Sequence, residues 1–406
     1  MYSHLPLDTL YIDLNSCFAT VEQQARPMLR GRPIAVTNRL AGNACIVAAS
    51  YEAKAHGVKV GMRRYEAEAL CPSLIFTETD PDKYTFVYRQ LRKILSSYSP
   101  DIAMKSIDEG TINLAASPPH LRQLDHAELV SELKTRLKTE IGCYMRCNVG
   151  ISSNCFLAKL AAELHKPDGY DEITPDNQRQ IFQTLSLRDL PGINYRLEAR
   201  LNAVNIFTPL EFLDADEATL TKLVFKSIDG KKWFQRLRGL EVDAISNQIH
   251  SIGRQYVLES RNLPRDKIEA HIIHLAEDVG QRLRRKHLYA RGVYLWLGDL
   301  DGTPVHRSIL LKSPIHTDAD IIHVARQLYS RLPSTARIVG ITLYKLQPTP
   351  ERQLHLNQPQ INRSHRLCQA TDAINRRFGY RTIFNADSFG TSQVKVKIPF
   401  GSTRFL

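Results

Sequence analysis

The sequence of 406 residues lacks any apolar run close to the roughly 18–20 residues that a transmembrane helix needs. Its first residues, Met1 to His4, also lack the basic and then apolar order of a signal peptide. We therefore expect a cytoplasmic protein.

Paired cysteines are missing as well. The seven cysteines are odd in number and scattered, and no two of them are separated by two residues. This excludes a zinc ribbon and a disulfide framework. Glycine and proline number only 20 each, which excludes collagenous and low-complexity chains. At about 150 residues per domain, the length predicts two to four folded domains.

Positive charge exceeds negative charge only in the later part of the chain. Residues 1–245 hold 30 Lys and Arg against 30 Asp and Glu. Residues 246–348 hold 15 against 9, and residues 349–406 hold 9 against 3, so the net charge of +12 arises there. This pattern predicts a module that binds a polyanion, attached to a body of balanced charge. A basic solvated surface would have the same counts, so charge alone leaves both readings open.

Strands and helices alternate over the first 173 residues. The apolar series from Tyr84 to Tyr98 steps by three and four, which predicts an amphipathic helix over 82–98. The alternation predicts an α+β sheet with helices on one face. Predicted strands cover 10–14, 34–37, 45–48, 102–105, 111–114 and 147–152; predicted helices cover 17–24, 51–54, 63–70, 82–98, 130–141 and 154–164.

The rest of the chain divides into three parts. Residues 176–240 have the pattern of short helices that break at Pro-Gly and Asp-Gly. Residues 251–346 read as β-α-β-β-α-β, the split βαβ of ferredoxin-like domains. The stretch that follows is polar, and we expect a tail with one helix near 366–378.

Three acidic residues stand at the ends of predicted strands. Asp13 closes the first strand, and Asp108 and Glu109 lie between two later strands. If those strands are neighbours in the sheet, the three carboxylates meet at one edge. Carboxylate oxygens bind Mg²⁺, and two such ions can hold the attacking and leaving oxygens of a phosphoryl transfer. Acids are also common at strand ends and in turns, so the spacing alone leaves a structural role open.

Six ordered motifs over residues 8–348 resemble the Y-family, or translesion, DNA polymerases, whose bacterial members include DNA polymerase IV and the catalytic subunit of polymerase V. Beyond the acids, the similarity rests on these segments: Tyr11 to Ala19, Ala49 to Lys59, Ser106 to Glu109, Val149 to Ser152 with Lys166 to Gly169, Leu190 to Ile193, and Ser251 to Arg254.

The resemblance implies an α+β multidomain, right-hand polymerase with a ferredoxin-like palm, small fingers, a helical thumb with a helix-hairpin-helix, and a βαββαβ little finger. We expect the palm at 1–16 and 80–173, the fingers at 17–79, the thumb at 174–245, the DNA-binding little finger at 246–348, and a C-terminal tail at 349–406.

The same resemblance implies the catalytic and metal-binding groups. Asp13, Asp108 and Glu109, with the carbonyl of Leu14, would bind two Mg²⁺ ions. Lys159 would line the primer side. The incoming nucleotide would be bound by Cys17, Phe18, Tyr51, Lys54 and Lys166.

Phe18 corresponds to the steric gate, a ring that occupies the space a ribose 2′-OH would need. The alternative is that Phe18 is an ordinary core residue. Tyr51, Lys54 and Lys166 correspond to groups that bind the triphosphate; without the family context, both lysines would read as exposed surface residues.

Three positions depart from the family's commoner pattern. Lys54 replaces an Arg, which exchanges a planar fork for a point charge. Ala48 replaces a Thr that contacts phosphate, and Asn15 replaces a second Asp. Asn15 and Lys54 are similar to the polymerase V branch and Tyr51 to polymerase IV, so the subfamily stays open.

Several basic or glycine-containing segments would contact primer-template DNA. The Leu190 to Asn194 turn resembles a helix-hairpin-helix, whose backbone N–H groups at Gly192 would meet a phosphate. Gln353 to Asn357 resembles the peptide that docks on the sliding clamp, although Asn357 replaces the usual aromatic; a plain linker is the alternative. Asp372 to Gly379 resembles a segment near the C-termini of bacterial members. Candidate phosphate contacts in the little finger are Arg254, Arg261, Arg282, Arg284, Arg285, Lys286 and Arg291.

These features predict a template-directed DNA polymerase that adds dNMP from dNTP to a primer 3′-OH, bypasses lesions with low fidelity and lacks proofreading, in a bacterial, nucleoid-associated location. The main alternative is a non-catalytic, polymerase-like repair adaptor. A nucleotide cyclase would share the metal carboxylates, but it would not explain the helix-hairpin-helix or the basic module.

Overall fold

A computed structural model describes residues 5–40, 44–243, 249–260, 262–298, 304–348 and 358–391, with side chains from residue 363 onward in the last range. The chain forms two compact units that divide near residue 246. No helix in these ranges is both long and apolar enough to cross a membrane.

The first unit is built on a five-stranded sheet in the order β5-β6-β1-β7-β8. β1 pairs antiparallel with both β6 and β7, and β5 pairs antiparallel with β6. The first and third strands of its βαββαβ motif thus lie in the middle, which confirms the ferredoxin-like arrangement. β8 was not predicted, because three residues are too few to show the two-residue alternation of apolar and polar side chains that identifies a strand. The strands are β1 (Thr9–Leu14), β5 (Ile102–Met104), β6 (Glu109–Asn113), β7 (Cys147–Ser152) and β8 (Tyr170–Glu172).

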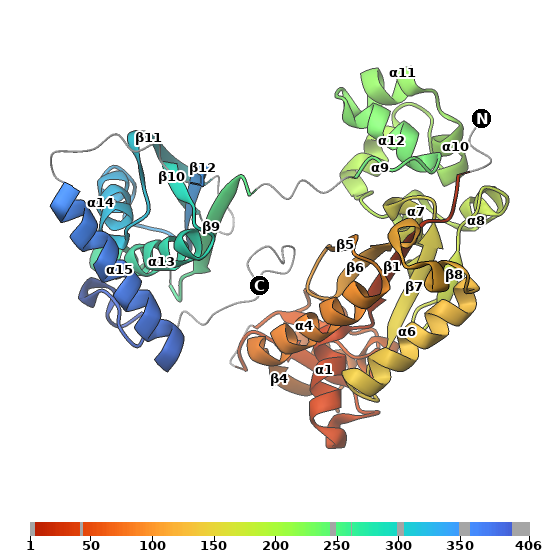
Figure 1. The fold of residues 1–406 in the computed structure, drawn as a ribbon, viewed down its shortest axis with the longest axis horizontal. Helices are drawn as coiled ribbons and strands as arrows, with labels where there is room; N and C mark the ends of the chain where they lie inside the picture. The colour runs from red at the N-terminus through yellow and green to blue at the C-terminus, as the bar shows by residue number, and fades with distance from the viewer. Residues whose placement is uncertain are drawn as a thin grey trace. The chain divides into compact units, whose positions relative to one another are not determined.

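The two faces of this sheet have different partners. Leu10, Ile12 and Leu14 of β1 join the core with the long helices α4 (Pro81–Tyr98) and α6 (His126–Glu140), which lie side by side in Figure 1. Because side chains alternate along a strand, Tyr11 points to the opposite face. There it packs against Ala158 and Ala162 of α7 (Cys155–Leu164). Asp13 shares this α7 face.

The close approach of α7 depends on a glycine. Gly150 lies opposite Tyr11 on β7. A Cβ at this position would stand 2.1 Å from the Ala158 carbonyl oxygen and 2.4 Å from the Ala162 nitrogen. Only a residue without a side chain therefore lets the backbone of α7 lie on the sheet.

A smaller sheet in the order β3-β2-β4 follows β1 in the chain. Two of its strands were predicted, but the third was missed because Ile75 to Glu78 is a short run just before a long helix. Its elements, with the helices that follow β1 and β3, are α1 (Cys17–Ala25), β2 (Ile34–Thr37), β3 (Ile46–Ala49), α2 (Tyr51–Ala55), α3 (Arg64–Leu70) and β4 (Ile75–Glu78).

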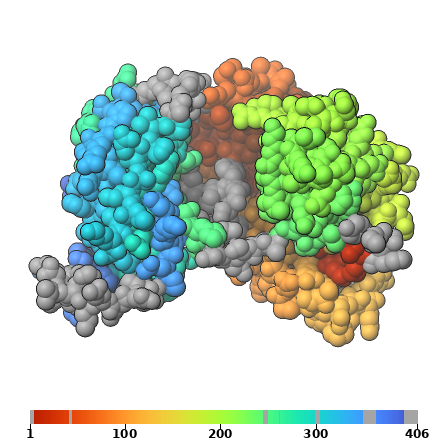
Figure 2. Space-filling view, turned by 90° about the horizontal axis from the view of Figure 1, so that it is seen from above, coloured from red at the N-terminus to blue at the C-terminus, as the bar shows by residue number. Residues whose placement is uncertain are grey.

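The helical region predicted for residues 176–240 is confirmed. In Figure 2 these residues, yellow-green to green, form one contiguous lobe. Its core gathers around Trp233, whose ring lies 5.3 to 6.0 Å from those of Phe156, Phe212 and Phe225. The helices are α8 (Gln178–Thr184), α9 (Tyr195–Asn202), α10 (Pro209–Asp214), α11 (Glu217–Thr219) and α12 (Asp229–Leu237), with a π-helix at Leu220–Phe225.

The second unit has the predicted β-α-β-β-α-β order. Its four strands form an antiparallel sheet in the order β11-β10-β12-β9. Each βαβ is split by a strand, as predicted: β12 lies between β9 and β10, and β10 lies between β11 and β12. The second and fourth strands lie in the middle of this sheet, whereas the first and third strands of the βαββαβ motif lie in the middle of the first unit's sheet. The elements are β9 (Ser251–Val257), α13 (Arg265–Arg285), β10 (Tyr289–Gly298), β11 (Val305–Ile315), α14 (Asp318–Tyr329) and β12 (Ile338–Gln347).

The end of the described chain packs on α13 rather than forming a loose tail. The helix predicted near 366–378 is present and longer, as α15 (Gln358–Phe378). Arg284 of α13 binds Asp372 of α15 at 2.7 Å, and Arg381 binds Glu277 at 2.9 Å. Some of the polar side chains that suggested a tail thus form ion pairs with α13.

A buried histidine joins α13 to this C-terminal segment. The two ring nitrogens of His274 lie 2.8 Å from the hydroxyls of Thr391 and Tyr380. Tyr380 in turn donates to Asp278 at 2.6 Å. Burial lowers the pKa of His274 from 6.5 to about 4, and this effect outweighs the neighbouring Asp278 carboxylate; the charges of Arg254, Arg381 and His271 lower it further.

We expect the second unit to lose stability in mild acid. Because His274 binds its proton near pH 6.5 when unfolded and near pH 4 when folded, its contribution is full above pH 6.5 and falls as the pH drops toward 4. Between pH 7 and pH 5 the loss is about 2 kcal/mol. The half-buried His316, whose pKa is also lowered to about 4, adds a further loss of the same sign.

Urea unfolding at pH 7 and pH 5, followed by fluorescence of Trp296 in a Trp233→Phe background, measures this loss. The His274→Gln variant should lose about half of the pH dependence. An unchanged dependence in that variant would contradict the role of His274.

Candidate active site

The three predicted acids come together at one edge of the large sheet. Asp13 of β1 lies opposite Glu109 of β6 in the antiparallel register. The N–H of Leu14 donates to the Asp108 carbonyl at 2.9 Å, which holds the turn before β6 against the end of β1. The prediction that these strands are neighbours is therefore confirmed.

Two lysines bind these carboxylates. Lys166 Nζ lies 2.6 Å from Asp13 Oδ2, and Lys159 Nζ lies 2.8 Å from Glu109 Oε1. The Tyr11 hydroxyl donates to Glu109 Oε2 at 2.7 Å. Lys159 was expected only to line the primer side, but the close packing of α7 places it on Glu109. The contact of Tyr11 with Glu109 was not predicted, although the two-residue alternation between Tyr11 and Asp13 would have put both on one face.

The acids lie in a poorly solvated place. Burial raises the pKa of Asp13 to about 6, more than the Lys166 charge lowers it, and Glu109 raises it further. The pKa of Asp108 is also raised, first by burial, against a hydrogen bond from Ser106 and with repulsion from Glu109. These carboxylates therefore lack enough positive charge nearby.

The donor set suits a divalent cation. Among the residues that the structure describes, no three His, Cys, Asp or Glu side chains are arranged as metal ligands. Asp13 and Glu109 are instead bound by Lys166 and Lys159. The edge nevertheless offers hard oxygen donors whose raised pKa values would be relieved by a cation. The residues fit the expected metal.

The predicted triphosphate ligands lie near the same edge. Tyr51 and Lys54 belong to α2, and Lys54 Nζ sits 4.6 Å from the centre of the Tyr51 ring. Burial lowers the pKa of Lys54, and the Lys166 charge lowers it further. Lys166, more than a hundred positions further along the chain, thus shares the electrostatic environment of Tyr51 and Lys54. Two positive charges that repel each other in this way favour an anion between them.

Cys17 and Phe18 begin α1 directly after the acidic edge. Ser16, which precedes them, adopts the left-handed conformation with φ 45° and makes no side-chain cap. The first turn of α1 thus begins beside the acidic edge without a side-chain cap from Ser16. Burial and the nearby Asp108 and Asp13 charges raise the pKa of the Cys17 thiol, so it stays protonated.

Phe18 has a packing role in this structure. Its ring is 5% exposed and stacks on Tyr84 with centroids 4.2 Å apart. Phe18 is therefore a core residue, as the alternative interpretation predicted. Whether the ring also limits the sugar of a nucleotide stays a prediction.

Asn15 positions the loop that carries Lys166. Its Oδ1 accepts from the Asp168 N–H at 2.8 Å, and its Nδ2 donates to Asn148 Oδ1 at 3.0 Å. An Asp at position 15 would lose the second bond. This gives the departure at Asn15 a structural reason, and it identifies Asn148 as a supporting residue that sequence reasoning missed.

The candidate DNA contacts separate into different groups. Gly192 forms an exposed turn with φ 92°, as a helix-hairpin-helix requires. The side chains of Arg254 and Arg284 are only 8% and 9% exposed; Arg254 binds Asp278, and Arg284 binds Asp318 and Asp372. These ion pairs stabilise the second unit, and contact of either arginine with DNA stays a prediction. Arg285 and Lys286 are exposed, and Arg282 and Arg291 are half-buried. Arg261 and Gln353 to Asn357 lie outside the described residues.

Comparison with known families gives a direct match. Residues 12–163 match the impB/mucB/samB family, and residues 249–356 match the impB/mucB/samB family C-terminal domain. The DNA polymerase IV of Pelotomaculum thermopropionicum is 33% identical over 392 residues, which cover 93% of this chain and 94% of that one. The chain belongs to this family, the Y-family translesion DNA polymerases.

Other relatives of this Y-family polymerase agree. DNA polymerase IV of Moorella thermoacetica is 33% identical over 93% of this chain and 95% of its own, and DNA polymerase IV 1 of Bacillus subtilis is 27% identical over 95% and 94%. A solved Y-family DNA polymerase chimera has the same fold, with a TM-score of 0.71 and 22% identity over 84% of this chain and 99% of that one.

Proposed function

We propose that this Y-family polymerase adds dNMP to a primer 3′-OH at the edge formed by Asp13, Asp108 and Glu109, with two Mg²⁺ ions. The observation that carries the proposal is the register of Asp13 opposite Glu109, which joins acids 96 positions apart at one sheet edge. Asp13, Asp108 and Glu109, with the Leu14 carbonyl, would hold the ions. When bound, the ions neutralise developing charge on the attacking and leaving oxygens.

The residues of the chain supply the positioning. Lys159 and Tyr11 fix the Glu109 carboxylate by bonds to its two oxygens. Asp108 is fixed by the Ser106 hydroxyl. With the carboxylates held by rigid strands, little reorganisation is needed when the substrates bind. Family membership implies dependence on a divalent metal; the identity of the metal as Mg²⁺ and the number of ions are our proposal.

The dNTP would lie between α2 and the end of α7. We infer that Tyr51, Lys54 and Lys166 bind the triphosphate and that the first turn of α1, at Cys17 and Phe18, offers N–H groups to it. Lys166 binds Asp13 in this structure, and its ammonium group would be available to a phosphate oxygen of the nucleotide if Asp13 held a cation instead.

Replacing Lys166 should weaken nucleotide binding. Because a charge-assisted hydrogen bond contributes about 1.5–3 kcal/mol, we expect Lys166→Ala to raise the KM for dNTP about tenfold to a hundredfold. Steady-state single-nucleotide insertion measures this change. Lys93→Ala, at an exposed position of α4, is the matched control. A normal KM in Lys166→Ala would remove the residue from the nucleotide site.

The domain assignments follow the same proposal. We assign residues 1–16 and 80–173 to the palm, 17–79 to the fingers, 174–245 to the thumb, 246–348 to the little finger and 349–406 to the tail. Gly192, Arg282, Arg285, Lys286 and Arg291 remain candidates for DNA contacts. A clamp contact through Gln353 to Asn357 and a place on the nucleoid complete the proposal. The solved insertion ternary complex of Dbh DNA polymerase, with a TM-score of 0.60, supports DNA and nucleotide as substrates.

Nothing observed favours the non-catalytic adaptor. Such a protein would be expected to lack metal ligands, yet Asp13, Asp108 and Glu109 are all present and share an edge. The departures at Lys54 and Ala48 leave that edge intact.

Primer extension by the purified chain tests the proposed function. We expect extension of a labelled primer on an undamaged and on an abasic template, with all four dNTPs and Mg²⁺. Removal of the metal with EDTA should stop it, and the Asp108→Asn/Glu109→Gln double variant should be inactive. No extension by the wild-type chain, with salt-sensitive DNA binding retained, would instead support the adaptor.

A further inference from the structure

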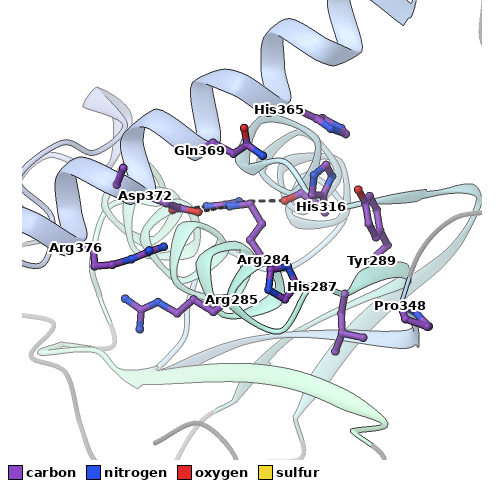
Figure 3. A pocket seen from close by; sticks show the side chains of 12 residues that line it. Arg284, Arg285, His287, Tyr289, His316, Pro348, His365, Gln369, Asp372 and Arg376 are labelled. Carbon is purple, nitrogen blue, oxygen red and sulfur yellow. Dashed lines mark hydrogen bonds and ion pairs between the residues drawn. The ribbon is translucent and has the colours of Figure 1, made fainter.

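A pocket of about 920 Å³ opens in the second unit (Figure 3). It lies where the C-terminal end of α13 and the start of β10 meet the end of β11 and α15. Its volume is typical of small-molecule sites. The α15 wall lies beyond residues 249–356, the part of this unit that the family model matches.

One end of the pocket is positively charged. Arg285 and Arg376 are both exposed, both line the pocket, and neither makes an ion pair with another described residue. Asp372, the acid in the lining, already accepts hydrogen bonds from Arg284 at 2.7 and 2.9 Å. Figure 3 shows Arg285 and Arg376 at the same end. Two guanidinium groups without a counterion favour a phosphate.

The other end is lined by flat rings. The centres of the Tyr289 and His316 rings are 4.3 Å apart, and those of His316 and His365 are 4.0 Å apart. Burial lowers the pKa of His316 to about 4, so its ring is neutral at pH 7. A wall of aromatic rings next to a cationic end is the arrangement on which single-stranded nucleic acids stack.

The pocket is preformed. Arg284 in its wall is bound at 2.7 Å to Asp318 of α14 and at 2.7 Å to Asp372 of α15, and its side chain is 9% exposed. This double ion pair fixes α15 against α13 and α14. The charged and aromatic ends are therefore held apart before any ligand binds.

We propose that this pocket binds one nucleotide unit of single-stranded DNA. The phosphate would lie between Arg285 and Arg376, and the base would stack against Tyr289, His316 and His365. The inference rests on the proposed function, because it assumes that the chain works on DNA with unpaired template ahead of the primer. A free nucleotide has the same phosphate and base, so the experiment must separate the two sources.

Equilibrium binding to the full chain tests the charged end. Fluorescence anisotropy with a labelled oligothymidylate of about 12 nucleotides, without metal or dNTP, gives the Kd. We expect Arg376→Glu to weaken binding about tenfold and to lower the salt dependence. Arg377→Glu changes the same charge at the next, exposed position of α15, outside the pocket lining, and should change the Kd less than about twofold. Equal effects of the two variants would overturn the proposal.

Photo-crosslinking tests the aromatic end and the source of the nucleotide. A strand that carries 5-iodouracil should crosslink to peptides containing Tyr289, His316 or His365, and crosslinks only elsewhere would overturn the proposal. Crosslinking of 5-iodo-dUMP at these residues without crosslinking of the strand would show a free-nucleotide site instead.

The two proposals fail separately. A chain that extends primers but binds the oligothymidylate equally as Arg376→Glu and Arg377→Glu contradicts only this inference. A wild-type chain that shows the Arg376 effect but extends no primer contradicts only the proposed polymerase activity.

Discussion

Primer extension by the Asp108→Asn variant is expected to fall at least about a thousandfold, because the amide removes a charged metal ligand that contributes several kcal/mol to the transition state. Binding of primer-template DNA should stay within about twofold, since the phosphate contacts we propose lie on other elements. Single-turnover insertion measures the first quantity, and anisotropy without dNTP measures the second.

The fold should tolerate this change. Burial and Glu109 already disfavour the charged form of Asp108, so an amide of the same shape costs little. We expect the melting temperature of the metal-free variant to match or exceed that of the wild type. Asp176→Asn, at an exposed position after β8, is the matched control and should extend normally. Extension by Asp108→Asn at the wild-type rate would refute the metal assignment.

The second large effect concerns sugar selection. If the Phe18 ring occupies the space of a ribose 2′-OH, Phe18→Ala should raise the insertion of ribonucleotides relative to deoxyribonucleotides about a hundredfold. The ratio of kcat/KM for rCTP and dCTP opposite a template G measures this selectivity.

Packing must be separated from this effect. Phe18 stacks on Tyr84 in the core, so removing its ring also costs about 3 kcal/mol or more in stability. Tyr84→Leu disturbs the same stack without changing residue 18 and should leave the rCTP to dCTP ratio unchanged. Equal changes in the two variants would show that Phe18 only packs.

The acidic edge could be predicted because each part has a local signature. The sequence itself shows an apolar strand with Asp13 near its end and an Asp-Glu pair between two strands. The pairing of β1 with β6 then brings these acids together. The two lysines that bind these acids were predicted to have other contacts: Lys159 with the primer side and Lys166 with the triphosphate. The Lys159 contact depends on α7 packing against Gly150, and the Lys166 contact on the loop held by Asn15. Neither contact has a signature in the local sequence.

The buried arginines show the limit of charge as a guide. Arginine is almost never buried unless it is paired, so Arg254 and Arg284 were expected on the surface. Their partners Asp278, Asp318 and Asp372 come from α13, α14 and α15, and only the assembled unit brings them together. The strand order of the second sheet escaped prediction for the same reason, because βαββαβ is compatible with either middle pair.

The docking of α15 makes the end of the described chain a part of the second unit's core. Arg284 of α13 binds both Asp318 of α14 and Asp372 of α15. The ring nitrogens of the buried His274 bind the hydroxyls of Tyr380 and Thr391, which follow α15. A shortened chain that ended before α15 would therefore leave a buried arginine with one partner fewer and a buried histidine with none of these hydroxyls, so that it would lose folding stability and not merely a terminal extension.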